Sequence, residues 1–318
     1  MSFRPSFSIG FNGSLSDLKQ ILQTNATIES LYSGGLQGVI AGGRPQYADS
    51  IDKIKQCIDL AHKNDILYEI ALNAPCGLHD HSDTGWWDGI ADYLKSLEDC
   101  GTDRIIASHP FIIDIVKSKT KMQVVASTIC EISEGRMAEY YENIGADIII
   151  PSMNVNFKLG KLNEIKNMLK HAKIRIMLNE HCLGDCPWRR FHHSHYAHSN
   201  QEYDYHINCK KLFMKNPYLI LTNNCIRPED IKQYQNITDS FKIVGRLVNI
   251  NKLCERIAAY DAQSFNGNYI DLCDEGLANM FYISNNKLTD LFTQKSTCQF
   301  DCKQCGYCEN LYLSYAKV

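Results

Sequence analysis

The chain has 318 residues, of which 44% are hydrophobic and 22% are charged, so it can bury a large core and is not intrinsically disordered. Its formal net charge of −3 excludes nucleic-acid binding through a positive field of the whole protein, but not through a local basic patch. Residues 1–13 contain no apolar signal stretch, and no run reaches about eighteen apolar residues, so we expect a cytoplasmic protein without a membrane span.

Short β-branched runs alternate with amphipathic segments from residue 7 to residue 262. The eight predicted strands are 7–11, 30–33, 67–72, 104–107, 123–126, 147–150, 173–178 and 241–244. Helices are predicted between them, among others at 51–63, 87–98, 135–144 and 162–171, where apolar residues recur at three-to-four spacing. This pattern predicts an α/β fold, a (β/α)₈ TIM-like barrel, and a doubly wound open sheet is the alternative because it shares the alternation.

Polar residues follow nearly every predicted strand. They are Asn12, Ser33, Asn73, Ser108, His109, Ser127, Thr128, Ser152, Asn154, Asn179, Glu180 and Arg246. Barrel enzymes build their active sites at the carboxyl ends of the strands, so this ring predicts a site at that face. The alternative for each single position is that Ser and Asn simply begin loops.

Alternation along the strands predicts which side chains point into the barrel. Lys242 and Arg246 share one parity on the last strand, and Glu69 and Asn73 share one on the third. An unpaired charge inside a barrel is costly, so we expect pairing or an anionic ligand there, with a structural ion pair as the alternative. Together with Glu180 and His181, which follow the seventh strand, these four residues are the candidate catalytic groups.

The seventh and eighth predicted strands lie farther apart than a loop and a helix require, which predicts an insertion over residues 180–230. Within it we expect a short strand at 218–222 and a helix that begins at Pro228 and runs to about Tyr234. The predicted organisation is a barrel domain, residues 1–262, which carries this insertion over its mouth, and a small C-terminal subdomain, residues 263–318.

Eight of the fourteen cysteines fall into two groups, Cys182, Cys186, Cys209 and Cys225 in the insertion and Cys298, Cys302, Cys305 and Cys308 in the tail. A chain of this size without a signal does not need a disulfide framework, so reduced thiolates that bind metal are expected. The first group would place a cluster at the barrel mouth, and its alternative is four thiols that pack as small hydrophobes. Six histidines share this stretch and could ligate metal or move protons, namely His181, His192, His193, His195, His198 and His206.

The tail group is the most specific motif in the chain. Its four thiols fall within eleven residues, and Gly306 permits a sharp turn between the last two. Such a segment can close around one tetrahedral metal ion or one cubane cluster. The spacing leaves zinc and iron–sulfur open, and a structural role is expected.

Two segments resemble motifs of a known family. Arg227-Pro228-Glu229-Asp230-Ile231 and, ten residues on, Phe241-Lys242-Ile243-Val244-Gly245-Arg246 resemble the S-P-x-D-L and F-K-I-E-G-R motifs of the collagenase-like peptidase family, family U32. Asn73 and the pair Ser127-Thr128 are similar to its third- and fifth-strand motifs. The resemblance runs from residue 7 to about residue 262, so the tail cysteines lie outside it.

The resemblance implies an iron–sulfur protein, because the better-understood relatives act in oxygen-independent hydroxylation of RNA bases and of the ubiquinone ring. It implies one 4Fe–4S cluster on Cys182, Cys186, Cys209 and Cys225, and as partners an electron donor or a related protein of the family. An enzyme or accessory protein that modifies an RNA base, a ring metabolite or a peptide is therefore the first functional hypothesis.

Two other functions stay open. A peptidase would use Cys182 as nucleophile with a histidine base, or a zinc-bound water, although the chain has no H-E-x-x-H segment. A non-catalytic, metal-stapled module would bind RNA or a protein through a basic run, whose alternative is a solvated helix face. That run comprises Lys158, Lys161, Lys166, Lys170, Lys173 and Arg175.

Overall fold

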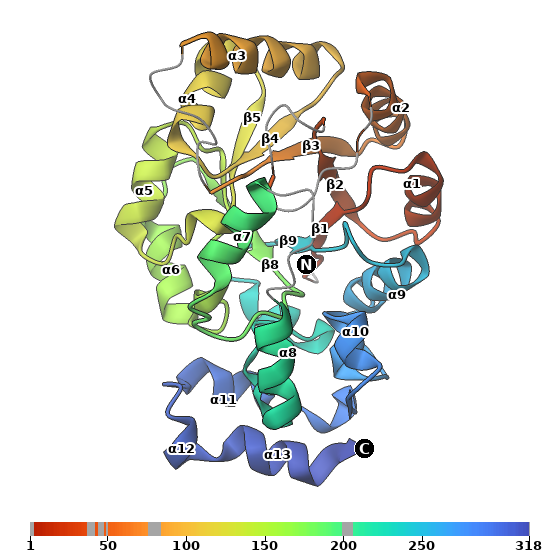
Figure 1. The fold of residues 1–318 in the computed structure, drawn as a ribbon, viewed down its shortest axis with the longest axis vertical. Coiled ribbons are helices and arrows are strands. Elements are labelled where there is room, and N and C mark those ends of the chain that lie inside the picture. The colour runs from red at the N-terminus through yellow and green to blue at the C-terminus, as the bar shows by residue number, and fades with distance from the viewer. Residues whose placement is uncertain are drawn as a thin grey trace.

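Nine parallel strands form a nearly closed barrel ringed by helices (Figure 1). The computed structural model describes residues 3–36, 42–43, 48, 50–75, 84–198 and 206–317. The strands are β1 (Ser6–Gly10), β2 (Ile28–Gly34), β3 (Leu67–Leu72), β4 (Arg104–Ala107), β5 (Gln123–Ala126), β6 (Ile148–Ile149), β7 (Lys173–Ile174), β8 (Ile176–Met177) and β9 (Ser240–Ile243). Because β1 pairs with both β2 and β9, the first and last strands of the repeat meet. The predicted barrel is confirmed, and the open sheet is wrong.

The predicted seventh strand, 173–178, is two short strands on either side of Arg175. The first half, β7, pairs with β6, and the second half, β8, pairs with β9. β7 is thus hydrogen-bonded to one edge of the sheet and β8 to the other, so this segment joins the two edges of the sheet. The Arg175 side chain is completely buried in the barrel.

Helices cover the outside of the barrel. They are α1 (Leu15–Leu22), α2 (Ile51–His62), α3 (Thr84–Asp99), α4 (Pro110–Lys119), α5 (Gly135–Asn143), α6 (Leu159–Met168) and α9 (Ile250–Asp261), with short 3₁₀ turns η1 (Thr128–Cys130) and η2 (Met153–Val155) after β5 and β6. In α2 the buried residues Ile54, Ile58 and Ala61 follow the helical repeat, and Ser50 caps the first turn by accepting a hydrogen bond from Lys53 N. The four helices predicted by apolar spacing are all present.

Within residues 180–198 and 206–230 the regular elements are helices. These are α7 (Arg189–His198), α8 (His206–Lys215), and the 3₁₀ helices η3 (Pro217–Thr222) and η4 (Pro228–Tyr234). The predicted strand at 218–222 is wrong, because Pro217 starts a tight helical turn in which Leu219 N donates to Asn216 O. The predicted helix from Pro228 to Tyr234 exists as η4.

The tail packs against the insertion, as the blue elements at the bottom of Figure 1 show. Its elements are η5 (Tyr269–Leu272), α10 (Glu275–Ala278), β10 (Tyr282–Ile283), η6 (Asn285–Lys287), α11 (Leu291–Thr297), α12 (Cys302–Cys305), α13 (Tyr307–Tyr315) and β11 (Ala316–Lys317). Lys158 of the barrel donates from Nζ to Cys298 O at 2.5 Å, and α13 lies against η3. The buried tail residues Ile270, Leu291 and Phe292 belong to the same apolar core as the barrel helices. Among the described helices, none has the length and apolarity to cross a bilayer.

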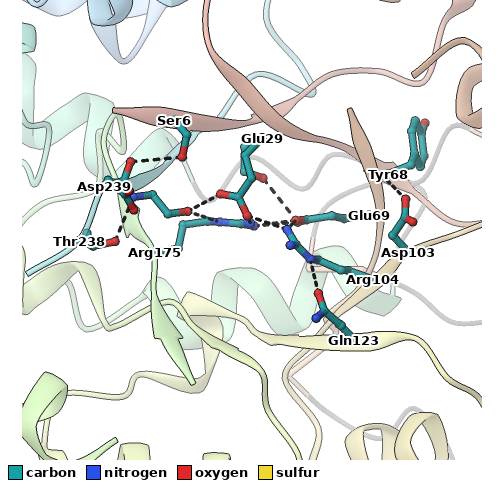
Figure 2. A network of polar contacts seen from close by, with 12 residues as sticks. Ser6, Glu29, Tyr68, Glu69, Asp103, Arg104, Gln123, Arg175, Thr238 and Asp239 are labelled. Carbon is teal, nitrogen blue, oxygen red and sulfur yellow. Dashed lines mark hydrogen bonds and ion pairs between the residues drawn. The ribbon is translucent and has the colours of Figure 1, made fainter. Parts of the chain in front are cut away.

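An ionic network closes the amino-terminal end of the barrel, and Figure 2 shows it. Arg175 Nη1 lies 2.8 and 2.9 Å from the two carboxylate oxygens of Glu69, and its Nη2 lies 2.9 Å from Glu29 Oε1. Arg104 Nη1 reaches Glu29 at 2.7 Å and Glu69 at 3.2 Å. The Ser240 hydroxyl donates to Glu29 at 2.6 Å. These contacts pair each buried charge with an opposite one, which is the condition for tolerating charge in an interior.

The network makes stability depend on acid pH. Burial alone would raise the pKa of Glu29, but Arg175, the Ser240 hydroxyl and Arg104 together lower it from 4.5 to about 2. Between these values the unfolded chain binds a proton at Glu29 that the folded chain does not, so the stabilisation is complete above about pH 4.5 and is lost as the pH falls towards 2. Urea unfolding of the wild type between about pH 5 and pH 3 is expected to show this loss, and Glu29→Gln is expected to weaken the dependence. The exposed Asp88→Asn is the control, and an identical slope in Glu29→Gln contradicts the assignment.

Above the network the barrel is filled by apolar side chains. The cluster consists of Tyr32, Ala71, Ile106, Val125, Ile148, Ile150, Met153 and Met177. On β3 the residues alternate as predicted, since Glu69 and Ala71 face the interior while Tyr68, Ile70 and Leu72 pack against the helices. The barrel therefore has an ionic floor, an apolar middle and a polar mouth.

Candidate active site at the barrel mouth

Lys242 places an ammonium inside the apolar middle of the barrel. Its Nζ lies 3.8 Å from the centroid of the Tyr32 ring, and the residue is 6% exposed. Burial lowers the pKa of Lys242 to about 7, with Glu69 opposing the shift and with Arg175 and Arg246 adding to it. An amine in this range can accept and donate a proton at neutral pH.

Arg246, three residues beyond the end of β9, is where three cavities of the mouth meet. It lines hollows of about 530, 230 and 40 Å³ and is itself buried. A guanidinium in this position can bind a carboxylate or phosphate in a bidentate manner and can donate hydrogen bonds to a carbonyl oxygen. Lys242 and Arg246 were both predicted to face the interior from strand parity, and both do.

The smallest cavity lies directly above the apolar middle, and Asn73, Ser127 and Glu180 line it together with Lys242 and Arg246. The Asn73 amide donates to Ser127 Oγ at 3.0 Å, and its oxygen accepts from Gly43 N at 3.0 Å. Both ends of this amide are thus engaged in holding strand ends and a loop together. Asn73 is a positioning residue in this arrangement.

Glu69 lies below the cavities instead of in them. Its side chain has no exposed surface, and it binds Arg175 and Arg104. Burial alone would raise the pKa of Glu69, but Arg175, Arg104 and Lys242 lower it, so the carboxylate is ionised. Its negative charge favours the protonated form of Lys242, which lies above it, and Glu69 itself does not line the cavities of the mouth.

Glu180 and His181 form a short chain of ionisable groups at the next cavity. His181 Nδ1 lies 3.6 Å from Glu180 Oε1, and its Nε2 lies 3.4 Å from Asp274 Oδ2. Glu180 and Arg246 line the same 230 Å³ cavity, and so does Asp274. Asp274 was missed from the sequence because it comes from the tail, where no motif marks it.

Several members of the predicted polar ring serve the fold. Ser108 Oγ donates to Ala74 O at 2.6 Å, His109 caps α4, and Ser152 Oγ donates to Glu131 at 2.5 Å. Asn179 joins β8 to β9, since its amide donates to Val244 O and accepts from Val244 N. For these positions the alternative of loop-starting residues is the better description.

Three of the four insertion thiols share one cavity. Cys182, Cys186 and Cys209 line it, and Cys182 also packs against the apolar cluster inside the barrel. Cys186 and Cys209 lie side by side, and a hydrogen bond from the Cys209 thiol lowers the pKa of Cys186 to about 6. Helix α7, which separates Cys186 from Cys209 in the chain, is anchored at the mouth by the ion pair between Arg189 and Glu131.

Cys225 lies apart from this cavity. Leu183 and Asn223 form an antiparallel bridge that joins the two segments, and Cys225 is not among the residues that line the cavity of the other three thiols. Cys225 is completely buried beside Cys273 and lies 3.8 Å from Tyr260 Oη. The predicted quartet is thus a group of three thiols plus a separate Cys225–Cys273 pair.

The histidines of the insertion are divided among several positions. His181, His192 and His193 line the thiol cavity, and His193 Nδ1 lies 3.1 Å from Gly43 O. The His195 ring lies 6.2 Å from the Tyr196 ring on the same helix, tilted by 55°. The side chains of His198 and His206 lie outside the described residues.

Most side chains of the basic run form contacts within the protein. Arg175 is buried in the barrel floor, so its assignment to a surface patch is wrong, because its position on the strand turns it inwards. Lys161 pairs with Glu134 and Glu164, and Lys166 Nζ donates to Asn236 O.

All four tail thiols line one cavity of about 260 Å³ between the tail and the insertion. Phe157 and Lys295 line the same cavity, and Lys295 is buried. Over the described ranges, no three histidine, cysteine or acidic side chains stand close enough as placed to hold a single metal ion.

Comparison with known proteins gives three findings. A family model described as Peptidase family U32 matches residues 13–297. A protein named "Uncharacterized protease MJ1657" from Methanocaldococcus jannaschii is 27% identical over 334 residues, covering 98% of this chain and 99% of that protein. The solved structure titled "The Structure of the U32 Peptidase Mk0906" superposes with a TM-score of 0.60 at 14% identity, covering 77% of this chain and 94% of that one. This last likeness bears on the fold alone.

Proposed function

This chain belongs to peptidase family U32, and on that premise we propose that it is an iron–sulfur protein that modifies a substrate at the barrel mouth without molecular oxygen. The observation that carries the proposal is the position of three thiols in one cavity, the first of which packs against the interior of the barrel. An RNA base, a ring metabolite and a peptide are the substrate classes proposed.

The donor set of this cavity suits iron. Thiolates are soft ligands that hold iron–sulfur clusters, and Cys182, Cys186 and Cys209 would hold three corners of a 4Fe–4S cube. Cys225 stays a prediction as fourth ligand, because it would have to leave Cys273 and reach the cavity that the other three thiols line. A cluster bound here supplies single-electron transfer.

The remaining groups of the mouth would bind and protonate the substrate. Arg246 would hold an anionic or carbonyl group, since it borders all three cavities. Lys242 would exchange a proton with the bound group from below. The negative charge of Glu69 would favour the protonated form of this amine and so oppose the lowering of its pKa by burial. Helix α7 would restrict the entry of water, because its residues Arg189 and His193 are tied to the barrel loops.

Metal analysis tests the proposal. After anaerobic purification, the wild type is expected to contain iron and sulfide and to absorb near about 400 nm. The double variant Cys182→Ser, Cys186→Ser is expected to lose about four iron atoms per chain relative to the wild type, whereas Cys254→Ser on α9 is expected to lose none. A double variant with unchanged iron content, or a colourless wild type that contains only zinc, contradicts the proposal.

A peptidase is the second candidate, favoured by the name of the Methanocaldococcus jannaschii relative. In that case Cys182 would act as nucleophile, and the other two thiols of the cavity would be dispensable. Cleavage of casein or gelatin that is lost in Cys182→Ser but kept in Cys186→Ser would favour the peptidase over the iron–sulfur protein. Loss of iron in both single variants without any cleavage would favour the cluster.

A further inference from the structure

We propose that the C-terminal cysteines hold a second 4Fe–4S cluster and that the buried ammonium of Lys295 is its counter-charge. The four thiols, those of Cys298, Cys302, Cys305 and Cys308, line the same 260 Å³ cavity. The family match ends at residue 297, one residue before the first of them. The proposal therefore stands on this segment alone and does not depend on the cluster proposed for the barrel mouth.

The four tail thiols lie near one another at this cavity. Cys298, Cys302 and Cys305 are each close enough to Cys308 to act on it electrostatically. Four thiolates accept either a single zinc ion or a 4Fe–4S cubane, and the spacing of these cysteines and the charge beside them favour the cubane.

The local backbone supports the same choice. Cys302, Cys305 and Cys308 form a C-x₂-C-x₂-C run, the spacing that carries cluster ligands in bacterial ferredoxins. The first two lie on the short helix α12, which ends at Gly306 with a φ of +63°. This left-handed turn, which glycine adopts without strain, redirects the chain so that Cys308 returns to the cavity.

Lys295 supplies the electrostatic argument. Its Nζ donates to Asn223 O at 2.5 Å and lies 3.3 Å from Asn223 Oδ1 and 4.6 Å from the centroid of the Phe157 ring. Lys295 is buried, with only 9% of its surface exposed. Among the described residues no carboxylate forms an ion pair with it. A buried charge without an opposite charge is costly.

The tail thiols are the groups that can compensate this charge. Cys298 and Cys308 are close enough to Lys295 to act on it electrostatically, as are Cys225 and Cys273. A cluster with four thiolate ligands is anionic, so its assembly would place negative charge beside the ammonium. A nearby cation in turn favours the reduced, more negative state of the cluster and raises its reduction potential.

Metal analysis of three variants of the full chain tests the site. The variant Cys182→Ser, Cys186→Ser, which removes the barrel thiols, is expected to keep about four iron atoms and four sulfides per chain with absorbance near about 400 nm. Adding Cys302→Ser and Cys305→Ser is expected to abolish both. The variant that carries only Cys302→Ser and Cys305→Ser is expected to keep the iron of the barrel mouth. The loss of either cluster is therefore observed separately. Zinc in place of iron in the first variant, or iron that survives removal of all four thiols, overturns the proposal.

The potential of the tail cluster tests the role of Lys295. In the variant that lacks the barrel thiols, redox titration followed by electron paramagnetic resonance is expected to give a more negative midpoint potential for Lys295→Met. Lys295→Arg, which keeps the charge, is expected to stay close to the parent, and so is the exposed Lys287→Met. A purely structural lysine would leave the potential of Lys295→Met unchanged, and that result overturns the counter-charge.

Discussion

Arg175→Met is expected to lower the free energy of unfolding by about 3–5 kcal/mol, measured by urea denaturation at neutral pH. The substitution keeps an unbranched apolar chain of similar length but removes the guanidinium from a site without exposed surface. Glu69 then loses its two shortest contacts, at 2.8 and 2.9 Å, and among the described residues keeps only Arg104 as a cationic hydrogen-bond partner. A buried carboxylate without adequate pairing is the source of the loss.

A double-mutant cycle separates this pairing from simple packing. Glu69→Gln in the Arg175→Met background is expected to cost less than in the wild type, because the charge that it removes has already lost its main partner. Arg136→Met on the exposed side of α5 is the control and is expected to change stability by less than about 0.5 kcal/mol. Additive effects of the two core substitutions, or a loss below about 1 kcal/mol for Arg175→Met, would show that the network contributes little.

The sequence predicted the barrel well because both of its signals are local. Strand–helix alternation located every barrel strand, and alternation within β3 and β9 correctly turned Glu69, Lys242 and Arg246 inwards. The division of the seventh strand at Arg175 depends on which neighbour each half meets, and that is a property of the closed sheet. The run 218–222 has strand-like composition, but no periodicity in five residues distinguishes a strand from the tight helix that Pro217 begins.

The site was predicted only in part, and the reason is distance along the chain. Residues at the strand ends could be placed from the barrel geometry, whereas Asp274 and Cys273 reach the mouth from the tail by a path that no pattern reveals. Proximity in sequence was also misleading for Arg175, which stands among surface lysines but faces the interior. The neighbour of Cys225 is Cys273 of the tail, and no sequence pattern reveals this contact between two distant segments.

Charged groups lie at three successive levels along the barrel axis. Glu69 and its arginines lie at the floor, Lys242 lies in the apolar middle, and Arg246 lies at the open end. The floor is internally neutralised by direct ion pairs, but the Nζ of Lys242 donates no hydrogen bond to any residue within the described ranges. Its ammonium is thus the costlier charge to keep buried, which makes it a candidate for a functional group.

Lys242→Met is expected to stabilise the folded chain at pH 7 by about 1–4 kcal/mol. Burial lowers the pKa of this amine from 10.5 in the unfolded chain to about 7 in the folded one. Between these values the unfolded chain binds more protons at this residue, so wild-type stability should rise with pH from about 7 towards 10. The variant should lack this rise, and the two unfolding free energies should converge as the pH increases.

Urea unfolding at about pH 7 and pH 9 measures both effects, with the exposed Lys232→Met as a control that should follow the wild type. A destabilising ammonium beneath the cavities of the mouth agrees with the proton-transfer role proposed for Lys242, because stability is commonly given up at sites that perform chemistry. If Lys242→Met is instead less stable at both pH values by the same amount, the amine contributes to the barrel as a packing and cation–π partner of Tyr32, and its role in proton transfer is contradicted.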